Sequence, residues 1–211
     1  MSINKTLYSA SFTAASLAFN ETNALLPILM STDADVLIKD EIRENRLLHI
    51  HSEQSRKRVI TEIQKRFRSV GRSFWELYMN QQEKEQRTFL FFVLLKCYRL
   101  LFDFHFNVVI PKWRSVEQKV ATSDFLSELY ELAAKDKFVD SWSEQTKKKV
   151  AKTYIVILKQ CGILDAVTMN LSSLRLKDEN YAYFLQNNEG WFLEACLLPA
   201  YEIERIKEIL R

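Results

Sequence analysis

The row of cations between residues 58 and 72 is the pattern in this sequence that could do chemistry. Residues three or four positions apart lie on one face of an α-helix. That spacing joins Arg58, Thr61, Lys65, Arg68 and Arg72. A row of positive charges on a helix suits a regularly spaced polyanion, and a nucleic acid is the obvious candidate. The alternative is the solvated outer face of a structural helix.

The same segment carries an apolar face on its other side. The apolar row is formed by Ile60, Ile63, Phe67 and Val70. Ser52 can cap the first turn, and Gly71 follows the last apolar residue. We therefore expect a basic amphipathic helix from about Glu53 to Val70.

Positive charge is concentrated around this helix. Residues 43–72 contain nine Lys or Arg and three acidic residues, a net +6 in a chain whose total is +3. Such a local excess favours a binding patch over general solubility. The candidate contacts in it are Arg43, Arg46, Ser55, Arg56, Arg58, Lys65, Arg68 and Arg72. Ser55, Arg56 and Arg58 lie near the helix start, from which base edges are usually read, and the later cations are the expected phosphate contacts.

A second helix also carries lysines on one side. Ser143 is its expected N-cap and Gly162 closes its C-terminal end, so the helix should run from Glu144 to Cys161. Lys148 and Lys152 lie opposite its apolar face and are candidates for a second basic surface. An ordinary solvated face is again the alternative.

The motifs of the common enzyme classes are missing. The sequence holds no phosphate-binding loop, no GxGxxG, no HExxH and no GxSxG. Its three cysteines are far apart without metal-ligand spacing, which favours buried thiols in a reducing compartment. His105 sits in an aromatic segment and is expected to be a hydrogen-bonded core histidine. We therefore expect no enzymatic activity, no cofactor and no metal.

The elements that position these side chains are expected to be helices. The chain has only 3 Gly and 3 Pro, too few for the tight turns of a large sheet. The further expected helices are 14–30, with a kink or a break near Leu26 caused by Pro27, then 34–45, 73–80, 82–107 with a break or bend at Pro111, 123–134 and 199–210. Residues 163–186 are the least helical stretch, and a small β-hairpin of 167–169 with 181–185 would resemble a wing.

The helical pair 34–45 and 53–70 resembles a helix-turn-helix, although its linker is longer than the usual turn. We expect residues 1–80 to form a basic N-terminal helical subdomain and residues 81–211 a helical bundle with a C-terminal extension. The apolar stretch 89–110 contains Lys96, Arg99 and Asp103, so we expect a buried central helix instead of a membrane span. Without a signal peptide, a cytoplasmic protein is expected.

Short motifs in a fixed order resemble the BrxA family of bacterial BREX phage-defence systems. Residues 11–17, SFTAASL, resemble the family's SFTAGSL opening, with Ala15 in place of the glycine. Further matches are Glu21, Asn45-Arg46, Ser55 with Arg58, the segment 96–99 (KCYR), the segment 123–125 (SDF), Thr146, Lys149 and the segment 162–164 (GIL). The resemblance runs from about Tyr8 to Leu174, and no firm motif is found beyond it.

The resemblance implies an all-α, NusB-like accessory protein that binds nucleic acid without catalysis. Double-stranded DNA and other BREX proteins are the implied partners, and RNA stays open because NusB binds RNA. The alternative is a helical protein–protein adaptor, suggested by the high aromatic content of 14 Phe, 8 Tyr and 4 Trp. That alternative requires exposed aromatic pairs at Phe74-Trp75 or Trp191-Phe192.

Overall fold

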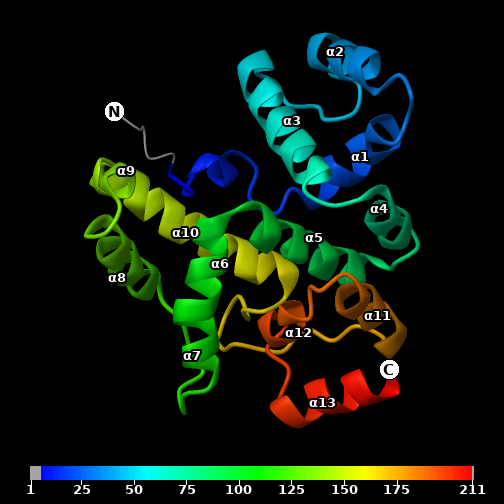
Figure 1. Ribbon diagram of the computed structural model, residues 1–211. Coiled ribbons are helices and arrows are strands. Elements are labelled where there is room, and N and C mark those ends of the chain that lie inside the picture. The colour runs from blue at the N-terminus through cyan, green and yellow to red at the C-terminus, as the bar shows by residue number, and fades with distance from the viewer. Residues whose placement is uncertain (1–5, 211) are drawn as a thin grey trace.

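Helices account for the regular structure of residues 6–210, the part of the chain that the computed structural model describes (Figure 1). In chain order they are the 3-10 turn η1 (Ser11–Ala14), α1 (Phe19–Leu29), α2 (Ala34–Glu44), α3 (Glu53–Arg68), α4 (Arg72–Met79), α5 (Glu83–Cys97), α6 (Arg99–Phe104), the π-helix η2 (His105–Val109), α7 (Ile110–Trp113), α8 (Thr122–Ala133), α9 (Lys137–Asp140), α10 (Glu144–Cys161), α11 (Asp178–Gln186), α12 (Trp191–Ala195) and α13 (Ala200–Ile209). The prediction of an all-α fold is confirmed.

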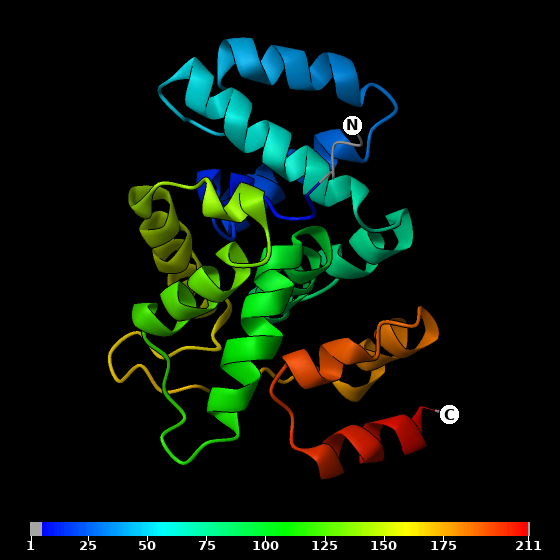
Figure 2. The same cartoon turned by 60° about the vertical axis from the view of Figure 1, so that its left-hand side comes forward.

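Two hydrophobic cores hold the molecule together. A small core of Ala18, Leu25, Ile38, Ile60 and Ile63 joins α1, α2 and α3, which form the upper part of the molecule in Figures 1 and 2. The large core occupies the remainder and includes aromatic side chains of α4, α5, α6, α11 and α12. Helix α3 spans the two parts, because its N-terminal half packs on α2 and its C-terminal half approaches α5.

Helix α5 is the centre of the large core, as predicted. Every side chain from Phe89 to Leu95 is buried, so the helix has no polar face over this stretch. The charged residues beyond this run reach partners at the edge. Lys96 pairs with Glu189, and Arg99 Nε lies 2.8 Å from Asp103 Oδ1, the i,i+4 pair that the spacing predicts. No helix among the described residues is long and apolar enough to cross a membrane.

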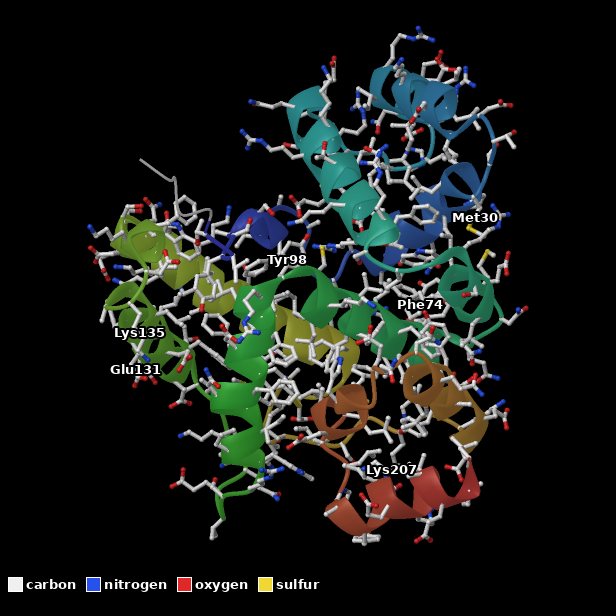
Figure 3. All side chains as sticks on the ribbon, viewed as in Figure 1. Met30, Phe74, Tyr98, Glu131, Lys135 and Lys207 are labelled. Carbon is white, nitrogen blue, oxygen red and sulfur yellow. The ribbon has the colours of Figure 1, made fainter. Side chains whose placement is uncertain are left out.

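The predicted continuous helix 82–107 is wrong in detail, since the backbone breaks at Tyr98. Tyr98 has extended dihedral angles (φ −126°, ψ 106°) that separate α5 from α6. Its ring packs on Phe12 with centroids 5.6 Å apart, and its hydroxyl bonds Glu62 of α3 (Figure 3). These long-range contacts fix an extended residue where local sequence favours a helix. Pro111 is expected to break or bend the helix; the structure shows no break there, since helical structure continues through Pro111 to Trp113 by way of the π-helix η2.

The predicted helix 14–30 is also interrupted, at its beginning. Ser16 and Ala18 have positive φ angles of 47° and 54°, so α1 starts only at Phe19. The cause is tertiary packing, because Phe12 and Leu17 are both buried in the large core. Near its other end α1 runs through Pro27 to Leu29, and no break occurs at Leu26.

The predicted hairpin within residues 163–186 is wrong in its second strand. Residues 181–185 lie in α11. The first part forms a loop closed by isolated antiparallel bridges, Leu164 with Leu171 and Lys119 with Asn170. Asp165 organises this loop, because its Oδ1 accepts hydrogen bonds from the backbone N–H groups of Val167 and Thr168. The short helices α9 and α12 were not predicted.

Candidate nucleic-acid interface

Helix α3 is positioned as the sequence predicts. Ser52 caps it, with the Ser52 Oγ accepting from the Ser55 backbone N–H at 3.4 Å. Ile60 and Ile63 are buried in the small core, and this orientation turns the cations outward. Figure 3 shows nitrogen-ended side chains extending from the outer side of α3. The apolar face therefore sets the direction of the basic face.

Three cations of this face are exposed without an acidic partner. Among residues 6–210, no carboxylate lies within ion-pair distance of Arg58, Lys65 or Arg68. Lys65 instead places its Nζ 4.2 Å from the centroid of the Tyr98 ring. Their neighbour Lys57 is neutralised by Glu53 at 2.6 Å, and the hydrogen bond from Lys57 lowers the pKa of Glu53. The face therefore keeps a positive field at Arg58, Lys65 and Arg68.

Arg56 is a correction to the predicted set of contacts. Its side chain is buried, and its guanidinium donates hydrogen bonds to the backbone carbonyls of Ile42 and Ile50. Every one of those bonds lies inside the α2–α3 junction. Arg56 is therefore a structural residue that ties the start of α3 to the preceding loop, and it is not available to a ligand.

The loop between α2 and α3 is fixed by buried polar groups. The Glu41 carboxylate accepts hydrogen bonds from three successive backbone N–H groups, those of Arg46, Leu47 and Leu48, at 3.0–3.2 Å. The Asn45 side chain accepts one more from Ile50 at 2.9 Å. With Arg56 donating to the Ile50 carbonyl, hydrogen bonds from three side chains hold this loop.

Arg43 and Arg46 are exposed at this end of the molecule, but acidic neighbours offset their charge. Arg43 lies 2.8 Å from Asp40 and 2.9 Å from Glu44, and Arg46 also pairs with Glu44. The hydrogen bond from Arg43 lowers the pKa of Glu44. The structure thus places both arginines beside the start of α3, in a less positive setting than the sequence count suggests.

Arg72 is not on the face of α3, which corrects the predicted row. Helix α3 ends at Arg68, and Arg72 is the first residue of α4. Its side chain lies 3.1 Å from Glu76 and donates to the Met30 carbonyl at 3.3 Å. The helical spacing that linked Arg72 to Arg68 is lost because the chain turns at Gly71.

A buried cluster anchors α3 to the body of the molecule. Tyr98 donates a hydrogen bond to Glu62, and Arg66 Nε donates to the Tyr98 hydroxyl at 3.2 Å. Arg66 also donates to the Leu17 carbonyl at 3.3 Å. Burial raises the pKa of Tyr98 above its ordinary range, so the hydroxyl stays protonated and can donate. Glu62 and Arg66 therefore serve the fold, while their neighbours on α3 face solvent.

The predicted second basic helix is confirmed in both bounds and orientation. Helix α10 runs from Glu144 to Cys161 with Ser143 as N-cap, and Gly162 follows with φ 89°. Lys148 and Lys152 are exposed on its outer face, as expected. Lys149 is exposed beside them and was not among the predicted contacts. The run of three lysines, residues 147–149, was the available signal for it.

A groove separates α3 from α10, with η1 between them. Its volume is about 610 Å³, and its lining residues are Ser11, Thr13, Ala14, Gln54, Ser55, Lys57, Arg58, Val59, Thr61, Glu62 and Lys149. Figure 2 shows η1 (dark blue) directly below α3, consistent with its contacts to α3 and α10. The structure thus brings Ser55 and Arg58 of α3 to the same groove as a lysine of α10, although some ninety residues separate them.

The aromatic pairs that an adaptor surface requires are mostly buried. Phe74, Trp75 and Phe192 are each at most 1% exposed. Trp191 is partly buried and stacks on Phe92 with centroids 5.5 Å apart. These two aromatic pairs therefore serve the core of the protein.

Other groups that could do chemistry do not converge. His105 is fully buried as predicted, with its Nδ1 2.9 Å from the Tyr154 hydroxyl and its Nε2 2.8 Å from the Ala195 carbonyl. Among residues 6–210, no group of three or more His, Cys, Asp or Glu side chains is placed to hold a metal ion. The basic surface over α3 and α10 is the candidate site that results.

Fold and surface together define an all-helical protein with exposed cations, unpaired among the described residues, on two neighbouring helices. The sequence model of the BrxA family matches residues 6–188, so the chain belongs to the BrxA family. It is 23% identical over 187 residues to the BREX protein BrxA of Paramagnetospirillum magneticum, covering 88% of this chain and 94% of that protein. A crystal structure of an uncharacterized protein from Magnetospirillum magneticum shares its fold, with a TM-score of 0.76, 24% identity and coverage of 90% and 98%. Membership of this family makes the chain a component of a BREX system.

Proposed function

We propose that this protein is a non-enzymatic accessory factor that binds double-stranded DNA within its BREX system. The observation that carries the proposal is the exposed face of α3, where Arg58, Lys65 and Arg68 have no acidic partner among the described residues. Cations left unpaired in the folded protein are free to replace the counterions of a nucleic acid. Cations already paired, as at Arg43, would first have to give up their carboxylate.

The arrangement of α2 and α3 supports this proposal. Helix α3 follows α2 as the second of two packed helices and presents its polar N-terminal half to solvent, as the recognition helix of a helix-turn-helix does. The loop of eight residues between them is longer than the usual turn, but its hydrogen bonds to Glu41 and Asn45 keep it in one shape. We regard the pair as helix-turn-helix-like and its role in DNA binding as part of the proposal.

A salt series tests the proposal. Duplex DNA should bind at low salt, and the logarithm of the affinity should fall linearly with the logarithm of salt concentration. The expected slope is about −0.9 for each phosphate neutralised, so the three α3 cations alone contribute roughly −3. Mobility shift or fluorescence anisotropy measures it. Absence of binding at low salt, or an affinity indifferent to salt, contradicts the proposal.

Charge reversal locates the site. The double variant Arg58→Glu with Lys65→Glu should abolish binding of duplex DNA, because it replaces two attractive charges with two repulsive ones. Lys119→Glu with Lys177→Glu is the matched control, since both lysines are exposed, distant from α3 and without an ion pair among the described residues. The control makes the same change in net charge and should bind like the parent. Equal loss in both variants would show that only total charge matters and would remove α3 from the proposal.

The same assay distinguishes the competing polymers. The NusB-like resemblance leaves RNA as the second ligand to test. Matched DNA duplex, RNA duplex and single strands should compete in that order of affinity if the proposal is right. Tighter binding of RNA would convert the proposal to an RNA-binding protein. Binding to none of them would favour the alternative of a protein–protein adaptor, although the aromatic pairs that this alternative requires are mostly buried.

A further inference from the structure

A second hollow on α10 adjoins the groove between α3 and α10. Its volume is about 570 Å³, and it is lined by Ser16, Gln145, Lys148, Lys149, Lys152, Thr153 and Val156. Lys149 lines both hollows, and the segment around η1 contributes residues to each. The two are therefore parts of one continuous surface that runs from α3 across η1 onto α10.

The chemistry of this surface is that of a phosphate-binding site. Its cations without an ion pair among the described residues are Arg58, Lys148, Lys149 and Lys152, whereas Lys57 is paired with Glu53. Six Ser or Thr residues (Ser11, Thr13, Ser16, Ser55, Thr61 and Thr153) supply hydroxyl groups. The single carboxylate in the lining belongs to Glu62, which accepts the hydrogen bond of Tyr98 and is buried. Arg, Lys and hydroxyl side chains make most contacts to phosphates in protein–DNA complexes.

The lining also favours a duplex over a single strand. Proteins that hold single strands stack the bases on aromatic side chains. The residues that line the two hollows include no Phe, Tyr, Trp or His. A duplex keeps its bases stacked internally, so it needs no aromatic side chains and can be held through its backbone by cations and hydroxyl groups.

The two walls are held at a fixed separation. Gln160 of α10 accepts a hydrogen bond from the Leu17 backbone N–H at 3.2 Å, and Arg66 of α3 donates to the carbonyl of the same residue at 3.3 Å. Phe12, within η1, is fully buried between them. Leu17 thus links α3 to α10 through both of its backbone polar groups.

We propose that α3 and α10 are the two walls of one DNA site, in which a single sugar–phosphate strand of a duplex crosses η1 and contacts Arg58, Lys149 and Lys148 or Lys152 in turn. This inference rests on the proposed function and adds the second wall, the floor and the path of the backbone. Lys149 lies at the centre of that path.

The first experiment removes the second wall. The triple variant Lys148→Ala, Lys149→Ala and Lys152→Ala should make the salt slope less steep by about 2–3 and lower the affinity at least tenfold near 0.1 M salt. The control is Lys119→Ala, Lys135→Ala and Lys177→Ala, three exposed lysines elsewhere, of which Lys135, just after the end of α8, is labelled in Figure 3. Parental binding in the α10 triple variant would overturn the two-walled site while leaving DNA binding by α3 intact. Loss of binding in the parent itself would instead overturn the proposed function.

The second experiment tests the floor of the groove without touching a cation. Ala14 is exposed on η1 and lines the groove, so Ala14→Glu would place a negative charge between the walls. We expect at least a fivefold loss of affinity for duplex DNA, whereas the neutral, similarly sized Ala14→Gln should bind within about twofold of the parent. Thermal unfolding of both variants checks that the fold is kept. Indistinguishable affinities for the two variants would overturn the path across η1, and equal or tighter binding of RNA duplex or single strands would overturn its assignment to duplex DNA.

Discussion

Arg56 and Arg58 show how two arginines of one segment take opposite roles. The bonds of Arg56 lie inside the α2–α3 junction, whereas Arg58 lines the groove without an acidic partner among the described residues. Composition could predict that this segment is basic, and periodicity could predict which residues are apolar. Neither could show that Arg56 donates hydrogen bonds to the carbonyls of Ile42 and Ile50, because these groups come together only when the loop has folded.

Replacing each arginine separately should distinguish these roles. Arg56→Ala should lower the free energy of unfolding by about 3 kcal/mol, because it removes a buried side chain and leaves two carbonyls of the α2–α3 junction without their donors. Arg58→Ala should change it by less than about 0.5 kcal/mol and weaken DNA binding instead. Urea denaturation followed by tryptophan fluorescence measures both. Equal stability of the two variants would contradict the structural role of Arg56.

For His105 the sequence predicted the type of environment but not the hydrogen-bond partners. The aromatic segment around it predicted a hydrogen-bonded core position. The partners, Tyr154 and the carbonyl of Ala195, come from elements 49 and 90 residues away and could not be foreseen. Burial lowers the pKa of His105 from 6.5 to about 3, so the side chain is neutral in the folded protein at neutral pH.

This low pKa makes stability depend on pH in a defined direction. Between pH 6.5 and 3 the unfolded chain binds a proton at His105 that the folded chain does not. The contribution of His105 to the free energy of unfolding is therefore fully present above pH 6.5. It falls by roughly 1 kcal/mol for each pH unit below that value. His105→Gln keeps polar groups without titrating. The free energy of unfolding of the parent should fall more steeply than that of the variant between pH 6.5 and 4, and parallel curves would contradict the prediction.

Among the helices, α10 was predicted correctly at both ends and the α5–α6 junction was not. Ser143 and Gly162 are local signals, a side-chain cap and a residue that adopts a positive φ, so sequence alone defines this helix. Tyr98 carries no local signal for a break. Its extended conformation depends on Phe12 and Glu62, which are distant in sequence.

In the candidate site, too, local features were predictable from the sequence and long-range contacts were not. The exposed face of α3 was predictable because apolar periodicity orients a helix. Its proximity to Lys149 was not, because η1 brings the two helices together through Leu17, within a segment predicted as the start of a continuous helix. Local patterns define the helices, and long-range contacts assemble the groove.

The glycine that ends α10 gives a prediction at this scale. Gly162→Ala should destabilise the protein by about 1–2 kcal/mol, because alanine is strained at φ 89° although an added Cβ would meet only ordinary contact with Leu174 at 3.8 Å. Gly71→Ala is the control, since φ at Gly71 is −75° and the nearest atom is 3.9 Å away. Thermal or urea unfolding should show the loss in the first variant only. A similar loss in both would indicate that crowding, not backbone strain, is responsible.

At the scale of the whole molecule, the C-terminal segment completes the large core. Phe192, Leu193 and Cys196 are fully buried, and the Cys196 carbonyl accepts a hydrogen bond from Leu174 at 2.8 Å. Helix α13 adds Ile206 to the core and pairs through Arg205 with Asp178 at 2.9 Å. The sequence shows no firm motif after Leu174, yet the large core depends on the residues of α11, α12 and α13.

Two shortened chains should therefore behave differently. A chain ending at residue 188, where the family match ends, would lose the α12 side chains from the core and the Ala195 partner of His105. We expect it to show no cooperative unfolding transition. A chain ending at Leu198 loses α13 alone and should stay folded and bind DNA, with stability reduced by about 2–3 kcal/mol through loss of Ile206. A stable, cooperative 1–188 chain would contradict this account of the core.

The π-helix η2 has a consequence for how this chain changes length in evolution. A π-turn amounts to one additional residue inserted into an α-helix, and here Ile110 N–H bonds His105 five residues back. The wider turn lies just before Pro111, where an ordinary helix would press the proline ring against the carbonyl of Asn107. The wider turn made by the inserted residue thus removes the clash between the proline ring and the carbonyl, and the proline in turn favours that wider turn. Among relatives we expect them to be gained and lost together, so that a one-residue gap at this helix coincides with a residue other than proline at position 111.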